Sequence, residues 1–136
     1  MEVIHVGDVP AIKVEDRILQ WAVGPKGVLS SDCCSSCIVK FSPGASGRPP
    51  HSHRDCEELI YILTGNGEMR GKDGESKPLK AGDFIILRKE EIHMLINSGS
   101  VEMQALCFYS APTDNSKYNF YDMETVEKPG TEKGLK

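Results

Sequence analysis

Residues 51–65 read HSHRDCEELIYILTG, and a third histidine, His93, follows in a later apolar run. A His-x-His pair in a β-strand places both rings on one face, because side chains alternate with a period of two. Three imidazoles with one carboxylate form a ligand set that suits a divalent metal ion. Three of the four histidines of the chain fall in this arrangement, so the pattern predicts a metal site built on strands.

Two spaced sets of residues surround these histidines. The first set is Gly44, His51, His53, Glu58 and Gly65, and the second is Gly82, His93 and Asn97. Together they resemble the two sequence motifs of the cupin family. The resemblance covers residues 44–97 and implies an all-β double-stranded β-helix, also called a jelly-roll or cupin barrel. It also implies one divalent metal ion bound by His51, His53, Glu58 and His93.

The resemblance leaves both the ion and the reaction open. Manganese, iron, nickel, cobalt and zinc are all compatible, and the carboxylate favours manganese or iron slightly. Cupins with such ligands include dioxygenases, isomerases, decarboxylases and lyases, and also domains that bind sugars or effectors without catalysis. We expect a small metalloenzyme that holds a small polar molecule on the metal. The alternative is a non-catalytic binding or sensing module, because fold alone does not decide function.

Either Glu57 or Glu58 fits the spacing from His53. Counting back from Gly65, only Glu58 leaves six intervening residues, as the family motif requires. In the strand that follows, Glu58 shares a face with the apolar Ile60, whereas Glu57 belongs to the other face. We therefore expect Glu58 to be the ligand and Glu57 to be its outward neighbour.

The rest of the chain has the pattern of an all-β sandwich or barrel, with short apolar runs between turn residues. The expected strands are 18–23, 37–41, 59–63, 84–87, 92–96 and 101–109, with a hairpin tip at 71–74 between strands 67–70 and 76–79. The expected interior wall consists of Ile60, Ile62 and Leu95, with Phe84 and Ile86 as further candidates.

A length of 136 residues is about one domain. We expect a single barrel with an N-terminal arm over residues 1–111. Residues 112–136 are expected to form a polar, loosely packed tail, with Tyr118, Phe120 and Tyr121 as isolated anchors and disordered residues near Lys136.

Composition excludes several partners. The net charge of −4 and the mixed charges provide no basic stripe, which argues against nucleic acid. No apolar run reaches the ~20 residues of a membrane helix. The N-terminus lacks the features of a secretory signal, and five cysteines without such a signal indicate reduced thiols. These features favour a cytoplasmic location.

The cysteines and two polar residues have alternative interpretations. Cys33, Cys34 and Cys37 have a Cys-x2-Cys spacing, but no second pair is present, so buried thiols are favoured over redox or soft-metal chemistry. Cys56, between His53 and Glu58, is a candidate thiol near the substrate. Asn97 is expected to close its strand by hydrogen bonds or to face the cavity, and His5 is expected on the surface.

Strand parity also predicts the assembly. With Glu58 and His93 directed inward, the outward side chains are Leu59, Tyr61, Leu63, Met94 and Ile96. A sheet face that meets solvent is usually polar, and large apolar faces usually meet another surface. We therefore expect a homodimer, with cover by the N-terminal arm or the C-terminal tail of the same chain as the alternative.

Overall fold

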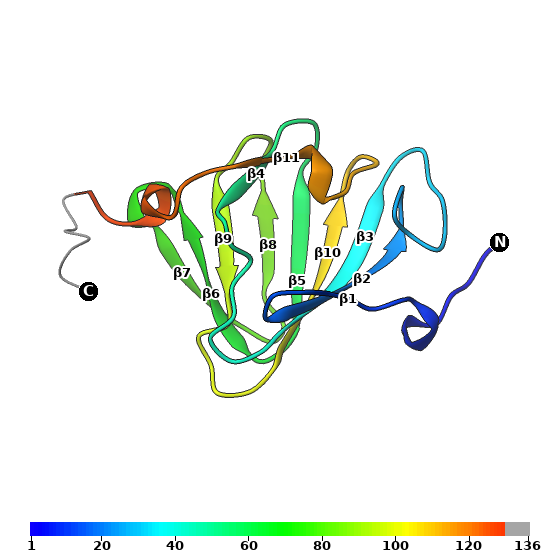
Figure 1. The fold of residues 1–136 in the computed structure, drawn as a ribbon, viewed down its shortest axis with the longest axis horizontal. Coiled ribbons are helices and arrows are strands. Elements are labelled where there is room, and N and C mark those ends of the chain that lie inside the picture. Colours follow the sequence, from blue (N-terminus) through cyan, green and yellow to red (C-terminus); the bar gives the residue numbers. More distant parts are fainter. Residues whose placement is uncertain (130–136) are drawn as a thin grey trace.

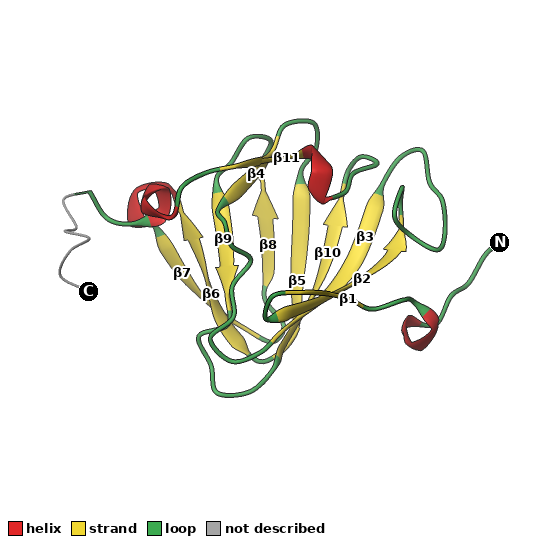
Figure 2. Ribbon diagram, in the orientation of Figure 1, coloured by secondary structure: helices red, strands yellow, loops and turns green. Residues whose placement is uncertain are grey.

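The computed structural model describes residues 1–129 and consists of two antiparallel β-sheets that face each other (Figure 1). The part of the chain that it describes contains no α-helix, only strands and short 3-10 turns (Figure 2). The expectation of an all-β chain is confirmed. Within these same residues, no helix has the length and apolar character needed to cross a membrane.

The six-stranded sheet has the order β1 (Ile12–Val14), β2 (Arg17–Val23), β3 (Ser35–Phe41), β10 (Met103–Tyr109), β5 (Glu58–Thr64) and β8 (Phe84–Leu87). The five-stranded sheet has the order β11 (Tyr118–Phe120), β4 (His51–His53), β9 (His93–Ile96), β6 (Asn66–Gly71) and β7 (Ser76–Lys80). The 3-10 turns are η1 (Val6–Asp8), η2 (Lys72–Gly74), η3 (Asn115–Lys117) and η4 (Met123–Val126). Every expected strand overlaps an observed one, whereas the three-residue strands β1 and β11 were not expected.

The core lies between the two sheets, and strands such as β3 and β10 bury alternate side chains in it. In β5, Ile60 and Ile62 are 2% and 0% exposed and point inward as expected. β8 differs from the prediction, since Phe84 and Ile86 are 71% and 44% exposed. Its inward residues are Ile85 and Leu87, which pair across the sheet with Ile60 and Glu58. Cross-strand partners share a face, so the inward face of β5 fixes that of β8.

The opposite face of the six-stranded sheet carries two apolar rows that cross β10, β5 and β8. Pairing aligns Phe108, Leu59 and Ile86 in one row and Leu106, Tyr61 and Phe84 in the other. We call these six residues the outer apolar face. Five of them are more than one-third exposed, and none carries a charge.

The corresponding face of the five-stranded sheet is covered. Met94, expected to point outward, is only 1% exposed. The C-terminal segment crosses this sheet: the backbone N–H of Tyr121 donates to Pro50 O at 2.9 Å. The hydroxyl of Tyr121 also forms a 2.9 Å hydrogen bond with that of Ser52, on the outward side of β4. The outward face of this sheet is therefore covered by the C-terminal tail of the same chain, which was the expected alternative to a dimer.

Residues 118–120 form a strand in place of the isolated anchors that the sequence suggested. β11 pairs with β4, with Tyr118 opposite His53 and Phe120 opposite His51. The first half of the tail is thus part of the five-stranded sheet. The expected disorder near Lys136 lies outside the described residues, and the domain division after residue 111 stays a prediction.

Gly65 ends β5 with a positive φ of 86°. A Cβ at this position would lie 2.8 Å from Met103 Cα and 2.9 Å from Glu102 O, whereas Gly44, with φ 81°, has no atom within 4 Å of its ideal Cβ. Both Gly65→Ala and Gly44→Ala place alanine in the left-handed region. Only the first adds a backbone clash, so we expect it to lower the free energy of unfolding by about 1–3 kcal/mol more than the second. Urea unfolding of both variants measures this difference, and equal losses would contradict it.

Candidate metal centre

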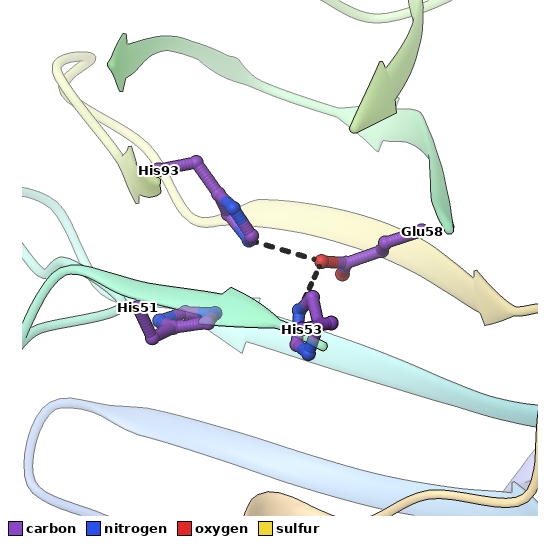
Figure 3. Close-up of side chains that lie close together, drawn as sticks. All are labelled: His51, His53, Glu58 and His93. Carbon is purple, nitrogen blue, oxygen red and sulfur yellow. Dashed lines mark hydrogen bonds and ion pairs between the residues drawn. The ribbon is translucent and has the colours of Figure 1, made fainter. Parts of the chain in front are cut away.

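Three strands bring the four expected ligands to one point between the sheets (Figure 3). β4 carries His51 and His53 on one face, β5 begins with Glu58, and β9 begins with His93, which pairs with His51. One ligand atom from each of the four side chains lies within 4.8 Å of all the others. The structure therefore gathers the residues that the sequence selected, and they can hold a metal ion.

Glu58 is the centre of this cluster. Its carboxylate is 3% exposed, and its Oε1 atom lies 3.0 Å from His53 Nε2 and 3.1 Å from His93 Nε2. Glu57 lies outside the cluster and forms a 2.9 Å ion pair with Arg88. The structure thus agrees with the count back from Gly65, which favoured Glu58.

The tautomers of two histidines make the cluster suited to a cation. His93 Nδ1 lies 2.8 Å from Glu91 O, and His51 Nδ1 lies 3.2 Å from Pro49 O. A carbonyl oxygen only accepts, so Nδ1 of each neutral ring must donate and Nε2 is left with a lone pair. The lone pair of His93 then faces the Glu58 carboxylate, an arrangement that a cation between them stabilises.

The pKa values have the direction that ligation requires. Burial is the largest cause that lowers the pKa of His51, the like charge of His93 is the next, and together with the smaller effects they bring it to about 3. Burial alone would raise the pKa of Glu58, but contacts with His53 and His93 outweigh it and hold the pKa well below its usual range. At neutral pH, His51 is a neutral imidazole and Glu58 is a carboxylate, the states in which both bind metals.

One ring atom of the cluster lacks a partner. His53 Nδ1 is buried and forms no hydrogen bond within residues 1–129. A metal-bound histidine usually has its second nitrogen held by an acceptor. His51 and His93 meet that condition through backbone carbonyls, and His53 differs from them in this respect.

Three members of the cluster, His51, Glu58 and His93, line an open cavity. Its walls include the apolar side chains Leu19, Val39, Phe41, Ile60 and Leu95, together with Arg17, Cys107, Tyr109 and Tyr118. The cavity therefore gives a small molecule access to the cluster from a largely apolar surface.

Tyr118 and Tyr109 form a polar edge of the cavity. The Tyr118 ring stacks on His51, with centroids 4.8 Å apart and planes at 12°, and its hydroxyl donates to Tyr109 Oη at 3.0 Å. Burial raises the pKa of both phenols, so both remain protonated at neutral pH.

Several cavity residues were not identified from the sequence. Cys107 and Tyr109 share the inward parity of Met103 in β10, a signal that strand periodicity contained. Arg17 and Tyr118 come from strand ends with no local motif.

The other singled-out residues have structural roles. Asn97 closes its strand, as expected: its side-chain amide donates to Phe41 O and Val101 O at 3.0 and 2.8 Å. Cys56 is 2% exposed and packs in the core instead of lining the cavity. Over residues 1–129, Cys33, Cys34 and Cys37 do not gather into a second metal-type cluster. His5 is exposed and accepts a hydrogen bond from Gly7 N.

Comparison with known proteins agrees with the sequence motifs. Residues 37–109 match the family model described as Cupin domain. An uncharacterized protein, MJ1618 of Methanocaldococcus jannaschii, is 35% identical over 121 residues, which cover 87% of this chain and 88% of the relative. The pectin degradation protein KdgF of Dickeya dadantii is 31% identical over 90 residues, covering 65% of this chain and 72% of KdgF.

A solved structure shows the same fold. The polyketide cyclase RemF of Streptomyces resistomycificus superposes with a TM-score of 0.72 at 24% identity, over 88% of this chain and 84% of RemF. A conserved protein of Klebsiella pneumoniae with a double-stranded β-helix domain superposes with a TM-score of 0.71 at 18% identity, over 90% of this chain and 98% of that protein. The expected double-stranded β-helix is thereby confirmed.

The His51 pKa predicts a pH-dependent stability of the metal-free protein. Unfolded His51 takes up a proton as the pH falls through about 6.5, whereas folded His51 stays neutral down to about 3. Between these values the unfolded state binds more protons, so the free energy of unfolding decreases as the pH falls. Urea unfolding with chelator at pH 7 and pH 5 should show a smaller decrease in His51→Gln than in the wild type. His5→Gln, which changes an exposed histidine, should match the wild type; the same decrease in all three proteins would contradict the prediction.

Proposed function

The chain belongs to the cupin family, and on this basis we propose that it is a small metalloenzyme whose single divalent ion is bound by His51, His53, Glu58 and His93. The observation that supports this most is the set of four ligand atoms, three of them from buried residues, that lie within 4.8 Å of one another. The Nδ1 atoms of His51 and His93 contact carbonyl oxygens, which leaves Nε2 of each ring free to ligate. Manganese and iron suit the set best, with nickel, cobalt and zinc compatible.

The ion supplies Lewis acidity and open positions for the oxygen atoms of a small molecule. The chain's own residues do the rest. Apolar walls such as Leu19 and Ile60 exclude water, and the protonated phenols of Tyr109 and Tyr118 provide hydrogen bonds beside the cluster. These features are compatible with dioxygenase, isomerase, decarboxylase or lyase chemistry.

The alternative is a binding or sensing module that uses the same cavity without turnover. The relative from Dickeya dadantii is named for pectin degradation, which supports the catalytic proposal. Turnover screening of the metal-loaded protein, with and without dioxygen, separates the two. Turnover that chelation abolishes and one metal restores supports the enzyme, whereas ligand binding without turnover supports the module.

The matched pair Glu58→Gln and Glu57→Gln tests the ligand set. Glu58→Gln removes the charge that faces two imidazoles, so we expect bound metal to fall at least tenfold. Glu57→Gln changes an outward side chain paired with Arg88 and should retain wild-type metal content. Elemental analysis of the dialysed proteins measures both. Stoichiometric metal in the combined variant His51→Ala, His53→Ala, His93→Ala would place the ion elsewhere.

We also propose that the protein is a homodimer joined through the outer apolar face. Among the described residues, neither terminal segment is placed over it. The N-terminal arm is held at β2, where Gln20 donates to Val6 O and Val9 O at 3.0 and 3.1 Å, and the C-terminal segment crosses the other sheet. A second copy is a suitable partner because two uncharged apolar faces are complementary without matched charges.

Light scattering at micromolar concentration tests the dimer and should give twice the chain mass of 15.0 kDa. Phe108→Glu places a charge in the outer apolar face and should shift the protein to a monomer. Val28→Glu changes a side chain that is 47% exposed outside this face and should remain dimeric. A monomer mass for the wild type would refute the proposal.

A further inference from the structure

Arg17 forms no salt bridge within residues 1–129, although it is half-buried in the wall of the cavity that the metal cluster also lines. Its Nη1 atom donates to Ser46 O at 2.8 Å and to Arg48 O at 3.4 Å. Within residues 1–129, no carboxylate lies within 4.0 Å of the guanidinium, and Nε and Nη2 form no hydrogen bond. Two backbone carbonyls thus hold the group in place while leaving several of its donors unused.

The acidic residues next to Arg17 in the sequence are occupied elsewhere. Glu15 and Asp16 both bind Arg48, at 2.9 and 3.4 Å. Burial lowers the pKa of Arg17, the largest effect on this group, yet an arginine remains charged at neutral pH. The charge of Glu15 raises this pKa as the second-largest effect, but that carboxylate is exposed and paired with Arg48. An anionic ligand in direct contact with the guanidinium would offset more of the desolvation cost of this cation.

The metal cluster in the same cavity lining would supply a second positive group. A divalent ion bound by three neutral imidazoles and the Glu58 carboxylate would leave one net positive charge. The lining also includes the apolar Leu19, Phe41 and Leu95. With the ion bound, the cavity would combine two positive groups with an apolar wall, a pattern that selects the shape and charge of a ligand.

We propose that Arg17 binds the carboxylate of a small organic acid whose other end carries an oxygen group held at the metal cluster. This inference rests on the proposed function and names the substrate class of the same site. A guanidinium fork matches the two oxygens of a carboxylate. A phosphate dianion would require further donors, and among the described residues Arg17 is the only arginine or lysine in the cavity lining. A single carboxylate matches that single charge.

Isothermal calorimetry on the metal-loaded protein tests the proposal with glycolate, 3-hydroxypropionate and 4-hydroxybutyrate, which vary the distance between carboxylate and hydroxyl. The primary amide of each acid serves as its neutral analogue. We expect at least one acid to bind, and its amide to bind at least tenfold more weakly. Arg17→Gln should weaken binding of that acid by about ten- to a hundredfold and leave binding of the amide within about twofold.

Two further variants control for structural effects. Arg70→Gln removes an arginine that binds Glu68 outside the cavity and should bind the acid as the wild type does. Arg17→Lys keeps the charge but loses the fork, so its affinity should fall between wild type and Arg17→Gln. If Arg17→Gln does not fold, Arg17→Lys and the acid-amide comparison in the wild type still test whether Arg17 binds the carboxylate.

The outcomes separate this inference from the proposed function. Three results in a protein that takes up metal would each overturn the role of Arg17. They are equal acid affinity in wild type and Arg17→Gln, equal affinity for acid and amide, and no binding of any of the three acids. Tighter binding of inorganic phosphate than of every acid overturns the carboxylate class. A wild type that takes up no metal contradicts the proposed function. The same titrations of that metal-free protein then test whether Arg17 binds the carboxylate without the ion.

Discussion

The burial of one carboxylate, that of Glu58, is the constraint on which the arrangement of the site depends. A buried ion loses hydration at a cost of several kcal/mol unless partners are supplied nearby. Glu58 begins a strand of one sheet, whereas His53 and His93, which both contact its Oε1 atom, belong to the other. The two sheets must therefore meet closely at this end of the barrel. The alignment of His51 opposite His93 in β4 and β9 follows from the same requirement.

The sequence predicted those features that strand parity or spacing determines. The His-x-His period places His51 and His53 on one face, because side chains alternate along a strand. The resemblance to the two cupin motifs supplied His93 and, through the count back from Gly65, the choice of Glu58. The rule of alternating side chains failed for β8. Its residues Phe84, Ile85, Ile86 and Leu87 are all apolar, so the run has no alternation that reveals the inward face. Only pairing with β5 determines it.

Arg17 and Tyr118 could not be predicted because long-range pairing places them. Arg17 begins β2 and lies opposite Phe41, and Tyr118 reaches His51 only because β11 pairs with β4. Neither position carries a local motif. Met94 was expected to point outward into a face covered by a second copy or by a terminal segment, and it is buried within the chain itself. Parity gives the direction of a side chain but does not predict which distant segment crosses over that face.

The pairing of β11 with β4 also makes residues beyond the barrel strands part of the site. Tyr118 contacts His51 by stacking and Tyr109 by a hydrogen bond, so it links the metal cluster to the six-stranded sheet. The outer apolar face lies on the far side of that sheet, on side chains that alternate with those lining the cavity. An interface there would bury one set of side chains of β5 and β10 without covering the other. The proposed assembly and ligand binding would therefore use opposite faces of the same strands, and the inward face would remain available to a small molecule.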